Sequence, residues 1–307
     1  NEREENSRAH FWQEDYEMPS IGGIGKGMTG RVTPHLNSIS QDFTQMAKHG
    51  LLNQIVGRRE EIKNIADILS GEKVNILIIG EPGSGKTSIV KGIAQKIFKG
   101  IEYKSLKFKR IVSLDPGALV AGTSNSGTLA DKLKIVMEEI KASGDIILFI
   151  DEIQNLLISE NAQNGDVPST PFAVLEPYLA TNRLQFIGAT NVANYRKHIE
   201  TNGSFSRLFD VVEIQEASKS DTLEILKVVA RKFENQYKII ISYPALRKVI
   251  ELGDKLIHER VMPDKAIDIL NRTASGISNS TKFLTAEDVA IEISQVTKVP
   301  VSSISQD

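Results

Sequence analysis

Hydrophobic positions along this chain follow two alternating periods. Short β-branched runs predict buried strands at residues 74–79, 111–114, 146–150, 184–187 and 211–214. Between these runs, apolar residues recur every three or four positions, as they do in amphipathic helices. Strands that alternate with helices in this way predict an α/β fold, in which helices flank a parallel sheet.

The helical period continues on both sides of the predicted sheet. Ahead of the first strand, two apolar faces comprise Ile39, Phe43, Met46 and Ala47, and then Ile62, Ile65, Ala66 and Leu69. After about Glu216, three helices are predicted at residues 223–233, 244–257 and 263–274. A capping-box pattern begins a fourth helix at Thr285. We therefore expect a small helical lid domain after the α/β domain.

The chain divides into three predicted parts. Residues 1–37 are expected to form a flexible N-terminal arm or linker, because glycines cluster between positions 22 and 30 without a hydrophobic period. Residues 38–217 form the predicted α/β domain, and residues 218–307 the helical lid domain with the start of a linker. The chain begins with Asn1 rather than Met, which we interpret as a piece of a longer protein.

Composition narrows the classes of function. Lys plus Arg total 37 and Asp plus Glu total 39, and the resulting net charge of −2 argues against binding to nucleic acid by bulk charge. The absence of cysteine excludes disulfides, thiolate metal sites and cysteine nucleophiles. No apolar run is long enough to span a bilayer, and no signal peptide is visible. We therefore expect a cytoplasmic protein without membrane insertion.

A phosphate-binding loop is the most specific motif in the sequence. Residues 80–87 read Gly-Glu-Pro-Gly-Ser-Gly-Lys-Thr and lie between a predicted strand and a predicted helix, which is the context of a P-loop. Backbone N–H groups of such a loop surround phosphate oxygens, Lys86 reaches the β- and γ-phosphates, and the Thr87 hydroxyl ligates Mg²⁺. The predicted ATP-binding residues here are Gly80, Pro82, Gly83, Ser84, Gly85, Lys86, Thr87 and Ser88.

Polar residues follow two later predicted strands. Asp151 and Glu152 come directly after residues 146–150, where Asp151 is placed to hold Mg²⁺ together with Thr87, and Glu152 to polarise the attacking water. Asn191 ends a Gly-Ala-Thr-Asn sequence after the next strand and can position that water; a helix cap is the alternative role for Asn191. We expect Glu152, Asn191 and Lys86 to be catalytic.

Together these motifs resemble those of AAA+ ATPases of the Clp type, in particular the first ATPase module of two-module unfoldases. The resemblance rests on Ile-Val-Gly-Arg at residues 55–58, the P-loop, Asp151-Glu152, residues 188–191, and Met-Pro-Asp-Lys-Ala-Ile-Asp at residues 262–268. It implies a P-loop AAA+ fold with a helical lid, and ATP or ADP with Mg²⁺ at the subunit interfaces of a homo-hexamer. It also implies client proteins or an adaptor, and a peptidase, as partners.

The resemblance assigns further residues to the site. The implied adenine contacts are Ile55 and Val56, with Ile225 and Ile267 closing over the base from the lid. Clp ATPases carry two arginines before a Phe that reach into the neighbouring subunit's site. Arg207 matches the first of them and Leu208 replaces the second, so Arg207 is the implied arginine finger.

Two departures from the Clp pattern concern action on a client protein. Clp unfoldases place an aromatic pore-loop residue after Leu-Val-Ala-Gly, whereas this chain has Asn125, which offers little apolar area to grip a polypeptide. The coiled coil that disaggregases insert into the lid has only residues 276–283 available, and these are too few.

The leading prediction is an ATP-hydrolysing module of a hexameric protein-remodelling or unfolding machine. The alternative is an ATP-dependent assembly or scaffold ATPase that does not thread protein, which Asn125 favours. A nucleic-acid motor is disfavoured, because the sequence has no basic stripe.

Overall fold

The computed structural model of the chain describes residues 33–71, 74–100, 103–121, 126–156, 171–181, 184–277, 282–298 and 300. The predicted arm up to residue 32 and the pore-loop position Asn125 lie outside these ranges. Within the described ranges, no helix is long and apolar enough to cross a membrane.

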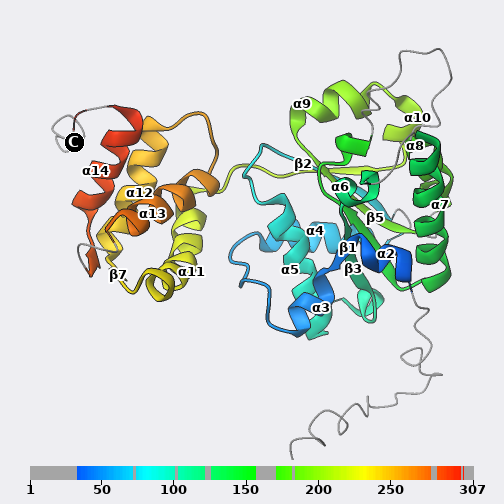
Figure 1. Cartoon of the computed structure of the whole chain (residues 1–307), viewed down its shortest axis with the longest axis horizontal. Helices are drawn as coiled ribbons and strands as arrows, with labels where there is room; N and C mark the ends of the chain where they lie inside the picture. Colours follow the sequence, from blue (N-terminus) through cyan, green and yellow to red (C-terminus); the bar gives the residue numbers. More distant parts are fainter. Residues whose placement is uncertain are drawn as a thin grey trace, which may run out of the picture. The chain divides into compact units, whose positions relative to one another are not determined.

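A six-stranded sheet forms the centre of the first part of the chain (Figure 1). Its strands are β1 (Ser40–Asp42), β2 (Asn75–Ile79), β3 (Arg110–Leu114), β4 (Ile146–Ile150), β5 (Gln185–Thr190) and β6 (Asp210–Glu213). They lie in the order β1-β3-β4-β5-β2-β6, with β1 antiparallel to β3 and the other pairs parallel. The predicted strands and the α/β class with a parallel sheet are therefore confirmed.

Helices cover both faces of the sheet (Figure 1). One face packs against α3 (Phe43–Lys48), α4 (Arg59–Leu69) and α5 (Lys86–Lys99), and the other against α2 (Pro34–Ser38), α7 (Ser126–Ser143) and α8 (Pro171–Leu179). Successive side chains of β2 alternate between the faces, so Ile76 and Ile78 join one core while Leu77 and Ile79 join the other. The unbroken apolar run of this strand thus reflects burial on both faces.

Shorter helices connect the larger elements of this part. They are η3 (Lys104–Leu106), α6 (Pro116–Val120), η4 (Ile153–Leu156), α9 (Val192–Asn194), the π-helix η6 (Tyr195–Glu200) and α10 (Gly203–Ser206). The turn between α10 and β6 is held by ring contacts, because the Phe205 and Phe209 centroids lie 4.7 Å apart in the core.

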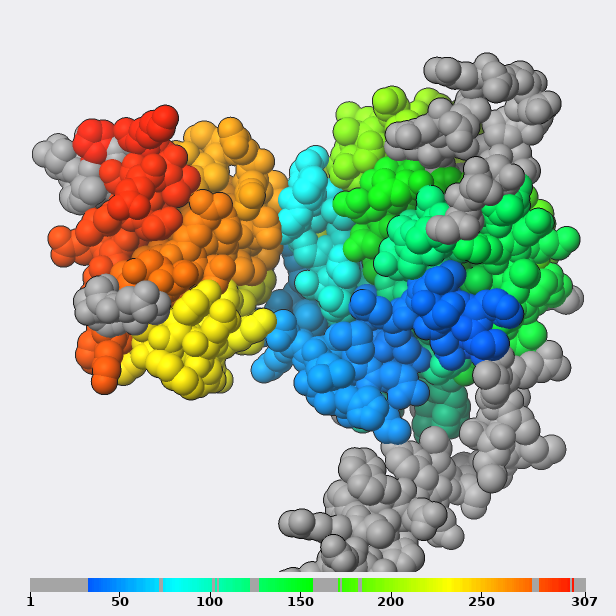
Figure 2. Space-filling model, in the orientation of Figure 1, coloured from blue at the N-terminus to red at the C-terminus, as the bar shows by residue number. Residues whose placement is uncertain are grey.

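The segment before α4 differs from its prediction. The hydrophobic period predicts one helix that contains both Ile39 and Phe43, and this prediction is wrong: α2 ends at Ser38, β1 pairs with β3, and α3 begins only at Phe43. The Asp42 carboxylate accepts a hydrogen bond from the backbone N–H of Gln45 at 2.8 Å and so caps α3. This segment lies on the molecular surface (blue in Figure 2).

The remainder of the chain is mainly helical and has its own hydrophobic core. Its elements are α11 (Lys219–Tyr237), β7 (Ile240–Ile241), α12 (Tyr243–Leu256), α13 (Asp264–Ile277), β8 (Phe283–Leu284) and α14 (Ala286–Thr297). Each helix contributes a buried side chain to this core, among them Leu226, Leu246, Leu270 and Ile293. The predicted helices and the capping box at Thr285 are confirmed. The third predicted helix, α13, starts at Asp264, one residue after the predicted Pro263.

Candidate functional site

The predicted site residues follow three neighbouring strands of the sheet. β4, β5 and β2 are adjacent and parallel, with Ile79 beside Thr190 and Ile150 beside Gly188. The P-loop follows β2, Asp151-Glu152 follows β4, and Asn191 follows β5. Because the carboxyl ends of parallel strands meet at one edge, the fold brings all three motifs to the edge where open α/β sheets bind ligands.

Backbone geometry explains three glycines of the loop. Gly83 and Gly85 have φ angles of 85° and 95°, in the left-handed region that side chains disfavour. A Cβ atom on Gly80 would lie 2.7 Å from the Ile214 carbonyl oxygen and 2.9 Å from the Ser84 Oγ. The loop therefore needs glycine at these positions to curl above the helix that begins at Lys86.

Ser84 leaves an unused polar atom inside the loop. Its side chain is buried, and its Oγ has no hydrogen-bond partner among the described residues. Buried polar groups are nearly always hydrogen-bonded, so the Ser84 hydroxyl is available to bond to a ligand or a water in the loop. Pro82 and Ser88, also predicted to bind ATP, are exposed beside it.

The Lys86 ammonium bonds to the backbone of the P-loop, the loop to which this lysine belongs. Its Nζ donates hydrogen bonds to the carbonyl oxygens of Gly80 at 2.9 Å and Glu81 at 3.0 Å. Burial lowers the pKa of Lys86, and the nearby carboxylates of Asp151, Glu81 and Glu152 offset part of this effect. A lysine that is partly desolvated and bonded only to carbonyl oxygens gains a stronger partner when a phosphate binds.

Thr87 and Asp151 meet as predicted for a shared Mg²⁺ site. The Thr87 Oγ1 donates a hydrogen bond to Asp151 Oδ2 at 2.5 Å, although the residues are 64 apart in sequence. One hydroxyl and one carboxylate fit Mg²⁺, which keeps several waters and takes further oxygens from phosphates. Among the described residues, no group of three or more His, Asp or Glu could hold a metal without such a ligand.

Glu152 has an unusual backbone conformation for a residue with a side chain. Its φ angle is 48°, and its N–H donates to Asp151 Oδ1 at 3.0 Å. Its carboxylate accepts a hydrogen bond from Asn155 Nδ2 at 3.2 Å. Left-handed backbone at a non-glycine residue is strained, and such strain concentrates at functional sites.

Asn191 performs the alternative role that its sequence position suggested. Its side-chain oxygen accepts the Asn194 N–H at 2.7 Å and caps α9. The cap fixes the Asn191 side chain at the end of β5, next to the strand that the P-loop follows. A role in placing water stays a prediction.

Sequence reasoning missed a buried hydrogen bond that joins two of these motifs. Thr190 Oγ1 donates to Gln154 Oε1 at 2.6 Å, and both side chains are buried. This bond ties the turn after Glu152 to the end of β5, next to Asn191. The available signal was Gln154, a polar residue two positions after Glu152. Its partner Thr190 can be identified only from the three-dimensional structure.

Arg207 lies far from the P-loop of its own chain. It is exposed at the end of α10, before the amino end of β6, and forms no ion pair with the described residues. β6 runs parallel to β2, with Asp210 beside Ile76, whereas the P-loop follows the opposite end of β2. Strands of this length separate the two ends by about 15 Å, so Arg207 cannot serve its own site in this conformation.

The implied adenine contacts come from two parts of the chain. Ile55 and Val56 are half-buried before α4, and a Cβ atom on Gly92 of α5 would lie 3.4 Å from Ile55. Ile225 on α11 is half-buried, and Ile267 on α13 is half-buried against the lid core. Contact of these four side chains with adenine stays a prediction.

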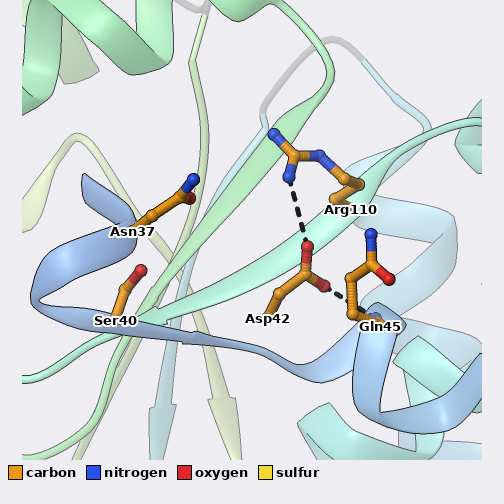
Figure 3. Close-up of a pocket in the computed structure, with 5 residues that line it drawn as sticks. All are labelled: Asn37, Ser40, Asp42, Gln45 and Arg110. Atoms are coloured by element: carbon orange, nitrogen blue, oxygen red, sulfur yellow. Dashed lines mark hydrogen bonds and ion pairs between the residues drawn. The ribbon is translucent and has the colours of Figure 1, made fainter. Parts of the chain in front are cut away.

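A hollow of about 250 Å³ lies away from these motifs (Figure 3). It is lined by Asn37, Ser40, Asp42, Gln45 and Arg110. Arg110 begins β3, at the amino end of that strand, and bonds to Asp42 at 3.2 Å and to Asp145 at 3.1 Å. Its charge is therefore already paired, and the hollow is a structural ion-pair site at the β1 edge of the sheet.

Comparisons with known proteins agree with this geometry. Residues 76–215 match the ATPase family associated with various cellular activities (AAA), and residues 218–306 match the AAA lid domain. The chain is 42% identical over 246 residues to the ATP-dependent Clp protease ATP-binding subunit ClpC of Staphylococcus epidermidis, and 41% identical to that of Staphylococcus aureus strain USA300. Each match covers 80% of this chain and 30% of the relative, so the chain spans less than a third of these relatives.

Solved structures of a related protein show the same fold. An Hsp104 structure with ATPγS and FITC casein matches with a TM-score of 0.80 and 32% identity, over 89% of this chain and 47% of that chain. The S. cerevisiae Hsp104–ADP complex matches with the same values. With an AAA domain, an AAA lid and these relatives, the chain belongs to the AAA ATPases and resembles their Clp-type members.

Proposed function

We propose that the chain is the Mg²⁺-dependent ATP-hydrolysing module of a hexameric, cytoplasmic machine of the Clp type that remodels or unfolds client proteins. The observation that carries the proposal is the 2.5 Å contact between Thr87 of the P-loop and Asp151 after β4. It joins a phosphate-binding loop to a carboxylate at the edge that Glu152 and Asn191 share. Similarity to ClpC and Hsp104 supports the Clp-type assignment.

Each residue then has a role in hydrolysis. The loop N–H groups and Lys86 bind the phosphates, while Thr87 and Asp151 hold Mg²⁺. When bound, Mg²⁺ neutralises charge on the transferred phosphoryl group. Glu152 accepts the proton of the attacking water, and Asn191 orients that water. Ile55, Val56, Ile225 and Ile267 enclose the adenine.

Arg207 completes the site of a neighbouring subunit. It is exposed and lies at the opposite end of the sheet from its own P-loop, which supports action across an interface. There its guanidinium stabilises charge on the γ-phosphate in the transition state. The proposed homo-hexamer follows, because a ring supplies every P-loop with a neighbour's Arg207.

An assembly or scaffold ATPase remains the second candidate, because Asn125 stands where Clp unfoldases carry an aromatic pore residue. An aromatic side chain adds on the order of 2 kcal/mol of apolar contact with a client polypeptide, and asparagine lacks this contact.

The test is ATP-dependent unfolding of a stably folded fluorescent protein by assembled rings. The scaffold alternative predicts weak or no unfolding by the unmodified module and stronger unfolding by Asn125→Tyr, at similar ATP turnover. If the unmodified module and Asn125→Ala unfold the substrate equally well, the residues that grip the substrate lie elsewhere in the chain.

A further inference from the structure

Arg58, just before α4, joins three separate segments through one guanidinium group. Its Nη1 donates to Glu61 Oε1 at 2.7 Å, and its Nη2 donates to the carbonyl oxygens of Ser84 at 3.0 Å and Gln215 at 2.8 Å. Ser84 belongs to the P-loop, and Gln215 follows β6. A planar fork of donors suits this simultaneous contact, which a lysine could make only in part.

The position of Arg58 is costly to maintain. Its φ angle is 58°, in the left-handed region, and only 11% of its side chain is exposed. The charge cannot be lost, because guanidinium stays protonated in proteins, so Glu61 must balance it. A strained backbone that holds a buried charge between two carbonyls indicates that these contacts determine its conformation.

The residues beside Gln215 connect the P-loop with the lid. We call residues 214–216 the hinge segment. The Ile214 N–H donates to the Ile79 carbonyl at 2.7 Å, directly before the loop. Glu216 Oε1 accepts the Met262 N–H at 2.6 Å and lies 3.8 Å from the Nζ of the buried Lys265 on α13. The hinge segment thus contacts the start of the P-loop on one side and the start of α13 on the other.

We propose that Arg58 is a positioning residue that couples the P-loop to the hinge segment, so that nucleotide on the loop changes the position of the lid. The inference rests on the proposed ATP-binding function. Phosphate binding shifts the Ser84 peptide, Arg58 transmits the shift to the Gln215 carbonyl, and Glu216 passes it to α13. Removing Arg58 separates nucleotide binding from lid movement, whereas a purely structural residue would weaken both together.

The absence of native cysteine allows a direct test by energy transfer. Dyes are placed on Asp131→Cys in α7 and Lys232→Cys in α11, two exposed positions in the sheet and lid parts of the full 307-residue chain. Transfer efficiency is measured with and without Mg²⁺–ATP in a Glu152→Gln background, which keeps ATP intact. Binding is measured by calorimetry in the same samples.

The inference predicts separation of the two readouts in Arg58→Gln. ATP affinity stays within about threefold of the unmodified value, while the ATP-induced change in transfer falls by at least about half. Arg58→Lys keeps part of the change. Arg59→Ala, which removes the exposed neighbouring arginine, keeps all of it. If Arg58→Gln does not fold, Glu61→Gln takes its place, and the same fall in the ATP-induced transfer change is expected.

Other results overturn the inference. An unaltered transfer change in Arg58→Gln or its substitute contradicts it, as does a proportional loss of affinity and transfer change. Loss of the ATP-induced transfer change in Arg59→Ala would show that the effect follows from the loss of nearby positive charge, not from the contacts of Arg58. ATP binding without a transfer change in the unmodified chain overturns the coupling alone. A lack of ATP binding overturns the proposed function as well.

Discussion

Single residues of the P-loop carry the nucleotide chemistry, and Lys86 is the clearest case. Among the residues that the structure describes, its ammonium bonds only to the Gly80 and Glu81 carbonyls, so phosphate oxygens offer it a better partner. Lys86→Ala removes at least one charge-assisted hydrogen bond, worth about 1.5–3 kcal/mol, and should weaken ATP binding roughly 10- to 150-fold. Calorimetry measures the loss, with Lys99→Ala at the exposed end of α5 as the control. Unchanged affinity in Lys86→Ala would place the phosphates elsewhere.

Glu152 should show a conflict between stability and activity. Its φ of 48° costs about 1 kcal/mol for any side chain, and glycine avoids this cost. Glu152→Gly should therefore leave the free energy of unfolding unchanged or raise it by up to about 1 kcal/mol, while abolishing turnover. Lys63→Gly, at an exposed position inside the regular helix α4, should instead lose about 1 kcal/mol. Urea unfolding compares them, and equal losses in both variants would show that the Glu152 backbone is unstrained.

The site residues that could be predicted from the sequence are those that belong to a continuous motif. The P-loop and Asp151-Glu152 follow buried strands, so strand and motif together placed Thr87 near Asp151. The contacts of Arg58 with Gln215 and of Gln154 with Thr190 could not be found this way, because the partners lie 157 and 36 residues apart. Such long-range contacts depend on strand order, which the hydrophobic pattern does not specify.

At the scale of elements, buried strands were easier to predict than edge structure. β2 and β4 are buried on both faces and therefore appear as continuous apolar runs. β1 is a short edge strand with polar Ser40, Gln41 and Asp42, so its sequence has no strand signal. Its pairing with β3 overrides the helical spacing of Ile39 and Phe43, as tertiary contacts often override local pattern.

The packing of α8 against α7 includes a pH-sensitive hydrogen bond. Tyr178 Oη donates to Glu138 at 2.7 Å, and burial together with this carboxylate raises the pKa of Tyr178 to about 12. An unfolded tyrosine titrates near pH 10, so the folded chain binds more protons between these values. The stabilisation is complete below about pH 10 and is lost as pH rises towards 12.

Tyr178→Phe should therefore lower the free energy of unfolding by about 1 kcal/mol at pH 8, and by less at pH 11. Urea unfolding of both proteins at the two pH values measures the difference, and Tyr243→Phe, at an exposed position, serves as the control. A difference between Tyr178→Phe and the unmodified chain that stays constant with pH would contradict the assigned hydrogen bond.

At the scale of the whole molecule, the proposed ring makes Arg207 and Glu152 act in one site from two subunits. Arg207→Ala should keep ATP affinity and lower turnover by roughly 10³-fold, as loss of an arginine finger does. Mixing Arg207→Ala with Glu152→Gln subunits should restore activity at interfaces that pair an intact Glu152 with a neighbour's intact Arg207. Phosphate release across mixing ratios measures the rescue, and Arg196→Ala, in η6, is the control arginine. A lack of rescue in rings shown to form would make Arg207 structural.

The central claim is that this chain hydrolyses ATP at the edge formed by β2, β4 and β5. The most direct test is steady-state phosphate release by the unmodified chain and by Glu152→Gln, with Mg²⁺–ATP binding measured for both. The account predicts turnover by the unmodified chain, equal binding by the variant, and at least about 100-fold slower release from it. Equal rates of release from both proteins would contradict the account.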